Sequence, residues 1–124
     1  SGNFQKNVLG AKLEVCSVKP TTGFYRNGCC ETDENDFGLH TVCAEMTSEF
    51  LEFSKSVGND LSTPRPEFEF NSLVQGDLWC LCASRWQQAF VSGKAPLVKL
   101  SSTNIATLNI CNLNDLKKHA IKET

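Results

Sequence analysis

The fold is decided by one stretch of the chain, Gly76-Asp77-Leu78-Trp79-Cys80-Leu81-Cys82-Ala83-Ser84-Arg85-Trp86. A turn at Gly76 leads into the six-residue apolar run 78–83, which is short and bounded in the manner of a buried strand. Ser84 can then cap a helix over residues 84–92, and Gly93 is placed to end it. This stretch therefore predicts a buried strand that leads into a helix.

Working outward from it, the chain supplies further elements at irregular intervals. Short apolar or alternating runs predict strands over residues 12–18, 39–45, 97–100 and 105–111. Helical spacing of apolar residues predicts further helices over residues 47–57 and 113–120, capped by Thr47 and Asn112. Because strands and helices do not alternate regularly, we predict an α+β domain. Its sheet is expected to be antiparallel or mixed with about five strands, or a small open barrel, accompanied by three helices.

Length and hydropathy bound the organisation of the chain. The 124 residues can bury one core, so we expect a single domain over residues 7–121 with tails at 1–6 and 122–124. Ser1-Gly2 resembles a cloning remnant. No apolar run approaches the roughly 20 residues of a membrane span, and no secretory signal is visible. These features favour a cytoplasmic protein without a membrane partner.

Charge is unevenly distributed although the net charge is only −2. Residues 31–69 hold ten acidic residues against Lys55 and Arg65. The basic cluster Lys117, Lys118 and Lys122 is too small for the concentrated basic surface that phosphate binding needs, so no nucleic-acid partner is expected. A small molecule or a protein is the expected partner, and the chain is expected to be a monomer or a homodimer.

Seven cysteines are many for this length, and their odd number cannot pair fully within one chain. In a reducing compartment, free thiols are expected rather than structural disulfides. Four residues are the weak candidates for a zinc site: His40, Cys43, Cys80 and Cys82. Because the chain contains no Cys-x-x-Cys spacing, no metal or other cofactor is expected, with zinc as the alternative.

The loop over residues 24–38 is the first candidate site. It carries vicinal thiols, Cys29 and Cys30, shortly after Arg26, and a nearby guanidinium would lower the pKa of a thiol. His40 is the leading candidate base for such a thiol. This loop therefore predicts either a reactive cysteine or a polar binding surface.

Arginine and aspartate side chains extend the candidate binding site. Asp60 and Arg65 lie in a loop with two prolines, and Arg85 follows the cysteine strand. Arg65 could hold a carboxylate or phosphate through two hydrogen bonds. We expect a small binding or accessory module with Arg26, Asp60, Arg65 and Arg85 as ligand-binding residues. The alternative is a thiol-dependent redox protein or a zinc or cysteine enzyme centred on Cys29 or Cys30 with His40.

Four words of the sequence resemble the Domain of Unknown Function 2237 family: Gly23-Phe24-Tyr25-Arg26-Asn27-Gly28-Cys29-Cys30, His40-Thr41-Val42-Cys43-Ala44, Gly58-Asn59-Asp60-Leu61-Ser62-Thr63-Pro64 and the stretch 76–86 quoted above. The resemblance runs in order from about residue 7 to 120. It implies a small stand-alone domain of bacterial or plant type and an intracellular setting, and it implies no activity. The chain departs from the family pattern at Ser102-Thr103-Asn104, where the resemblance leads us to expect Ala-Thr-His.

Overall fold

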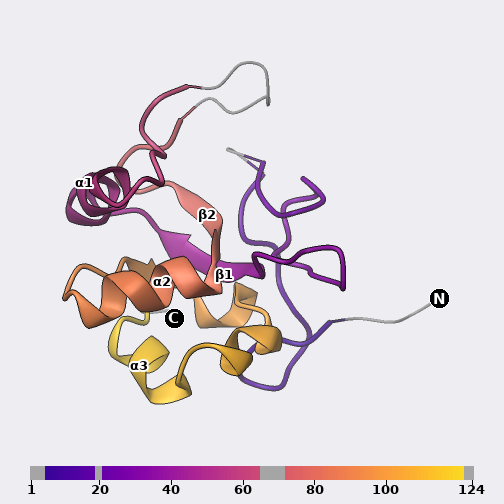
Figure 1. Cartoon of the computed structure of the whole chain (residues 1–124). Helices are drawn as coiled ribbons and strands as arrows, with labels where there is room; N and C mark the ends of the chain where they lie inside the picture. The colour runs from indigo at the N-terminus through magenta and orange to yellow at the C-terminus, as the bar shows by residue number, and fades with distance from the viewer. Residues whose placement is uncertain (1–4, 19–20, 65–71, 122–124) are drawn as a thin grey trace.

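Two antiparallel strands form the centre of the structure, a computed structural model that describes residues 5–18, 21–64 and 72–121. In chain order the elements are β1 (His40–Glu45), α1 (Ser48–Ser56), β2 (Leu78–Cys82), α2 (Ala83–Val91), β3 (Leu97–Val98), the 3-10 helices Leu100–Ser102 and Ile105–Asn109, and α3 (Leu113–Lys118). The strands pair antiparallel in the order β2-β1-β3 (Figure 1). The α+β class and the three helices are confirmed, but the described residues form three strands rather than about five.

Two predicted strands are replaced by other structure. Over residues 12–18 the backbone bonds to separate loop segments, as when the Cys16 N–H donates to the Gly28 carbonyl at 2.7 Å. Over residues 105–111 the chain turns into a 3-10 helix, because the side chain of Asn104 accepts a hydrogen bond from the backbone and starts it. In both places local hydrogen bonds outweigh the alternation of apolar residues.

The helices begin close to the predicted positions. Thr47 and Asn112 cap α1 and α3 through their side chains, as the sequence predicts. The predicted Ser84 cap is wrong, since α2 begins at Ala83, directly after β2. The Ala83 N–H donates to the carbonyl of Leu39 at 2.9 Å. Leu39 directly precedes β1, so a residue outside the helix accepts a hydrogen bond from its first N–H group.

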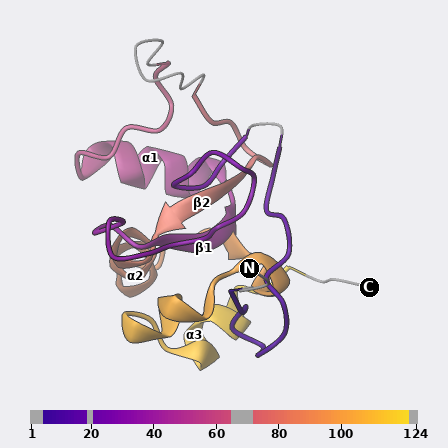
Figure 2. The ribbon, with the colours of Figure 1, turned by 90° about the vertical axis from the view of Figure 1, so that its right-hand side faces the viewer.

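The core lies around the strand pair. In both Figure 1 and Figure 2, α1 lies above β1 and β2, and α3 lies below them. Trp86 of α2 is fully buried, and its Nε1–H donates to the Pro96 carbonyl at 3.2 Å. The other buried residues of this core include Val42, Phe50, Leu81, Val98 and Leu116. Burial of these side chains fixes α2 and β2, and with them the boundary between the two elements.

The N-terminal third lacks helices and regular strands over residues 5–18 and 21–39. It faces the viewer in Figure 2, and two disulfides, Cys16–Cys43 and Cys30–Cys80, tie it to the strands. The expectation of free thiols is therefore wrong for these four cysteines. The paired cysteines are 27 and 50 residues apart in the sequence. The sequence therefore does not reveal the pairing, which depends on the path of the loop over the sheet.

Candidate active site

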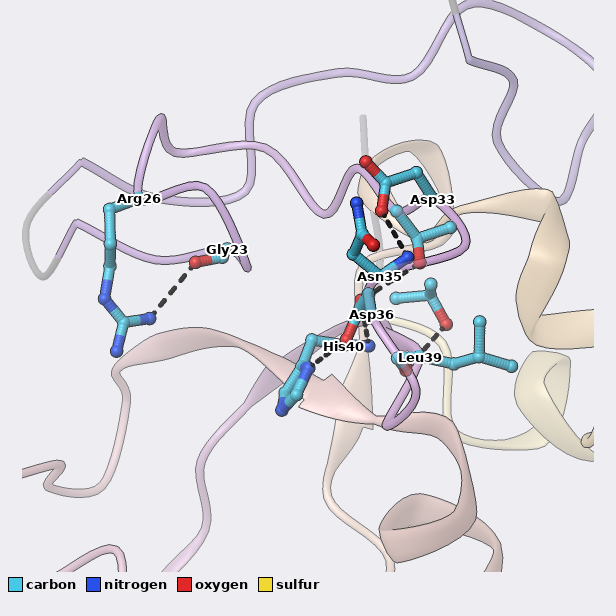
Figure 3. A network of polar contacts seen from close by, with 9 residues as sticks. Gly23, Arg26, Asp33, Asn35, Asp36, Leu39 and His40 are labelled. Atoms are coloured by element: carbon cyan, nitrogen blue, oxygen red, sulfur yellow. Dashed lines mark hydrogen bonds and ion pairs between the residues drawn. The ribbon is translucent and has the colours of Figure 1, made fainter.

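An aspartate, Asp36, anchors a histidine at the start of β1. The Asp36 carboxylate is fully buried and accepts a hydrogen bond from Nδ1 of His40 at 2.6 Å (Figure 3). The same carboxylate accepts the backbone N–H of His40 at 2.9 Å and the hydroxyl of Thr32 at 3.0 Å. Since three donors hold the carboxylate, it fixes the orientation of the imidazole.

The backbone between these residues is strained. Leu39 has a φ of 47°, a left-handed conformation that a branched apolar residue rarely adopts. Its carbonyl accepts the N–H of Thr41 at 2.7 Å as well as that of Ala83 at the start of α2. The pairing of β1 with β2 also shifts register between His40 and Val42. Strain and a bulge beside one histidine are typical of positions where a fold aims a functional side chain.

Cys82 lies opposite this histidine. His40 and Cys82 are register partners across the strand pair, and the side chain of Cys82 contributes to the raised pKa of His40. Gly38 packs against both, because a Cβ there would lie 2.9 Å from Cε1 of His40 and 3.3 Å from Sγ of Cys82. The Cys82 thiol is free and partly exposed. A hydrogen bond thus joins Asp36 to His40, and His40 in turn lies opposite a free, partly exposed cysteine.

Two features describe the electrostatic surroundings of His40 and Cys82. The hydrogen bond to Cys82, partly offset by burial and reinforced by the hydrogen bond to Asp36, raises the pKa of His40 from 6.5 to about 9. The imidazole is therefore protonated at neutral pH. Cys82 is also the N-cap of α2, at the positive end of the helix dipole.

Aromatic side chains border the histidine. The Phe24 ring stacks against the His40 ring, with 6.1 Å between centroids, and Tyr25 contacts Phe24 edge-on at 5.1 Å. Both Phe24 and Tyr25 are exposed. Arg26, from the same loop, places its guanidinium 4.9 Å from the centroid of the Trp79 ring. The site is thus bordered on the side of this loop by an apolar rim that could contact a ligand.

The predicted nucleophiles lie elsewhere. Cys30 is fully buried and disulfide-bonded, so it offers no thiol in this structure. Cys29 is free, but burial and the charge of Glu31 raise its pKa. Arg26 does not contribute to the pKa of Cys29 as expected, because its guanidinium lies over the Trp79 ring and donates to the Gly23 carbonyl. Cys30 is therefore not the predicted free thiol, whereas a reactive thiol at Cys29 stays a prediction.

The predicted zinc set divides between two places. His40 and Cys82 form the pair described above, while Cys43 and Cys80 are buried in the two disulfides. The sulfurs of Cys80, Cys16 and Cys30 lie within 4.8 Å of one another. The four residues therefore do not lie around one point, as the predicted zinc site would require.

The remaining binding candidates, Asp60 and Arg85, form hydrogen bonds with residues of their own segments. Asp60 accepts hydrogen bonds from the Ser62 N–H at 2.9 Å and the Thr63 hydroxyl at 2.6 Å, and these bonds lower its pKa. Its carboxylate thereby orders its own loop. Arg65 lies outside the described residues. Arg85, in the first turn of α2, donates to Gln88 at 3.4 Å.

The sequence analysis did not identify Asp36, and it named Cys82 beside His40 only as a weak candidate for zinc binding. A signal for the first exists in the spacing Asp36-x-x-x-His40, but it is common in loops and carries little information alone. A signal for the second is the position of Cys82 at a strand-to-helix boundary. Because the sequence analysis took Ser84 as the N-cap of the helix, it did not identify Cys82 as the N-cap residue.

Asn104, at the departure from the family pattern, has a structural role. Its side-chain amide donates to the Cys30 carbonyl at 3.1 Å and caps the 3-10 helix that follows. The residue is buried, so it supports the loop rather than a surface site.

Comparison with known proteins places the chain in a family. Across the parts of the chain that the structure describes, no helix has the length and apolar character to span a bilayer. No curated protein matches the sequence. A family model described as "Uncharacterized protein conserved in bacteria (DUF2237)" matches residues 6–120. The chain therefore belongs to the DUF2237 family.

Proposed function

We propose that the protein is a thiol-dependent enzyme with Cys82 as its nucleophile and His40 as its acid–base group. The observation that carries this proposal is the position of His40 between the buried Asp36, to which it is hydrogen-bonded, and its register partner Cys82. A nucleophile, a base within hydrogen-bond reach and a third group that orients the base are the parts that covalent catalysis requires. Asp36 acts through His40 and is a positioning residue.

Acyl transfer is the reaction that suits these parts. The Cys82 thiolate attacks a carbonyl carbon, a C–S bond forms, and the bond to the leaving group breaks as the His40 imidazolium gives that group its proton. Water then attacks the thioester, the neutral His40 takes the water proton, and the thiolate leaves. The first turn of α2 adds N–H groups beside Cys82 that can stabilise the oxyanion.

A binding module remains the second candidate, supported by the exposed rings of Phe24 and Tyr25. Such a module would hold a ligand against the rim without forming a covalent bond. It requires no special reactivity of Cys82, so the two functions differ in an observable property of one sulfur.

An activated acyl ester separates the two. Mixed with p-nitrophenyl acetate, the protein is expected to release a burst of p-nitrophenol and to carry one acetyl group on Cys82, found by peptide mass spectrometry. Cys82→Ala should abolish the burst, and the control Cys29→Ser should retain it. Acetylation of Cys29 and Cys82 at equal rates would overturn the proposal and leave the binding module.

A further inference from the structure

Apart from the candidate active site, the structure gathers four cysteines into a separate buried cluster: Cys16, Cys30, Cys43 and Cys80. The sulfurs of three of them, Cys16, Cys30 and Cys80, lie within 4.8 Å of one another, and the fourth sulfur, of Cys43, is bonded to that of Cys16. In a tetrahedral zinc site with Zn–S bonds of about 2.3 Å, the sulfurs are separated by about 3.8 Å. Once the two S–S bonds are open, three thiolates lie near the spacing that one ion needs, and the fourth, of Cys43, lies next to that of Cys16.

The cluster is closed to solvent. The exposed fractions of Cys16, Cys30, Cys43 and Cys80 are 4%, 0%, 0% and 2%, and Leu78 packs against them. Among the residues that the structure describes, no histidine or carboxylate joins the sulfurs of Cys16, Cys30 and Cys80. A complete set of four protein ligands, with no position left for water, is typical of structural zinc rather than catalytic zinc.

The backbone holds the ligands independently of the S–S bonds. Cys43 and Cys80 are register partners on neighbouring strands. The Cys80 N–H donates to the buried hydroxyl of Thr22 at 2.7 Å, and the Cys43 N–H donates to that of Thr103 at 3.1 Å. Such supporting bonds preorganise ligands before a metal arrives.

The missing Cys-x-x-Cys spacing would count against a zinc site only if the ligands came in pairs close together in the sequence. Here two ligands come from loops and two from paired strands, so the fold itself supplies the convergence. The loop of residues 5–39 has no regular element of its own and needs a cross-link to the sheet. Either two disulfides or one metal ion can provide that link.

We propose that the reduced protein binds one Zn²⁺ through the thiolates of Cys16, Cys30, Cys43 and Cys80. Binding releases four protons and forms four Zn–S bonds. A thiol reductant, which supplies four electrons and four protons, converts the two disulfides described above into the four thiols that bind the ion. This structural site is independent of the nucleophile, because Cys82 takes no part in it.

Cobalt provides the direct probe. The full chain, reduced and handled anaerobically, is titrated with Co²⁺, which gives characteristic visible and charge-transfer bands in a tetrathiolate site. We expect one Co²⁺ per chain, displaced by one Zn²⁺. Cys16→Ser should weaken Zn²⁺ binding at least about 10-fold. The matched controls Cys29→Ser and Cys82→Ser should leave both stoichiometry and spectrum unchanged.

The remaining outcomes contradict the proposal. If the reduced protein shows four free thiols at these positions and no tetrathiolate bands, the cluster is a disulfide site only. Bands lost in Cys82→Ser but kept in Cys16→Ser would place the metal elsewhere. Should the reduced, metal-free chain be unfolded, Zn²⁺ must restore its circular dichroism, and failure to do so also overturns the site.

Discussion

His40 and Cys82 face each other at the end of the β1–β2 pair, while Nδ1 of the imidazole is held at 2.6 Å by the buried Asp36. The pair lies where β2 ends and α2 begins, so its geometry depends on the same core that fixes these two elements.

Asp36→Asn should lower the pKa of His40 from about 9 toward its ordinary 6.5. The amide keeps the shape of the carboxylate but removes its negative charge, so the protonated imidazole loses a stabilising partner. The titration of the His40 Cε1–H resonance by NMR measures the shift. The reactivity of Cys82 should fall at least about 10-fold in the same variant. An unchanged titration midpoint would show that Asp36 does not position the histidine.

Stability should depend on pH through His40. Its folded pKa, about 9, is raised above the unfolded value of 6.5 by Cys82 and Asp36, against partial burial. The protonated imidazole therefore adds stability that is fully present below pH 6.5 and is lost as pH rises through about 9. Urea unfolding at pH 6, 7.5 and 9.5 measures it, and His40→Asn should remove this part of the decline. Equal declines in both proteins would refute the assignment.

Gly38→Ala should disturb the site more than the fold. The new methyl group would lie 2.9 Å from Cε1 of His40 and 3.3 Å from Sγ of Cys82, so one of these side chains must move. We expect acylation of Cys82 to slow markedly, with a stability loss of about 1–3 kcal/mol. Thermal unfolding and the acetylation rate give the two numbers. If Gly38→Ala is destabilised but Cys82 is acylated at the wild-type rate, Gly38 does not pack closely against His40 and Cys82.

Reduction together with chelation should release the N-terminal third from the sheet. Residues 5–18 and 21–39 form no regular element, and the cysteine cluster links them to β1 and β2. Loss of one such cross-link typically costs about 2–5 kcal/mol. Hydrogen exchange should therefore rise in this segment before it rises in α2. A uniform rise across the chain would show instead that the cluster supports the entire fold.

Sequence patterns predicted the elements whose signals are local. Apolar spacing located α1, α2 and α3, and the short run at Leu78 located β2. The strand expected over residues 105–111 failed because the cap at Asn104 starts a 3-10 helix, a choice that alternation cannot reveal.

The candidate site was predictable only in part. His40 was identified from its residue type and its position next to a polar loop. Its true partners were not, because Asp36 reaches it through a strained turn at Leu39 and Cys82 through strand pairing across 42 positions of the chain. The four-cysteine cluster escaped for the same reason, since its members come from separate segments.

The rate at which Cys82 reacts with iodoacetamide, compared with that of Cys29 in the same molecule, tests the central claim most directly. Peptide mass spectrometry at pH 7 resolves the two rates, and circular dichroism confirms that each variant is folded. We predict that Cys82 reacts at least about 10-fold faster than Cys29 in the wild-type protein and that His40→Asn abolishes the difference. Equal rates in the wild-type protein, or a fast Cys82 that is unaffected by His40→Asn, would contradict the account.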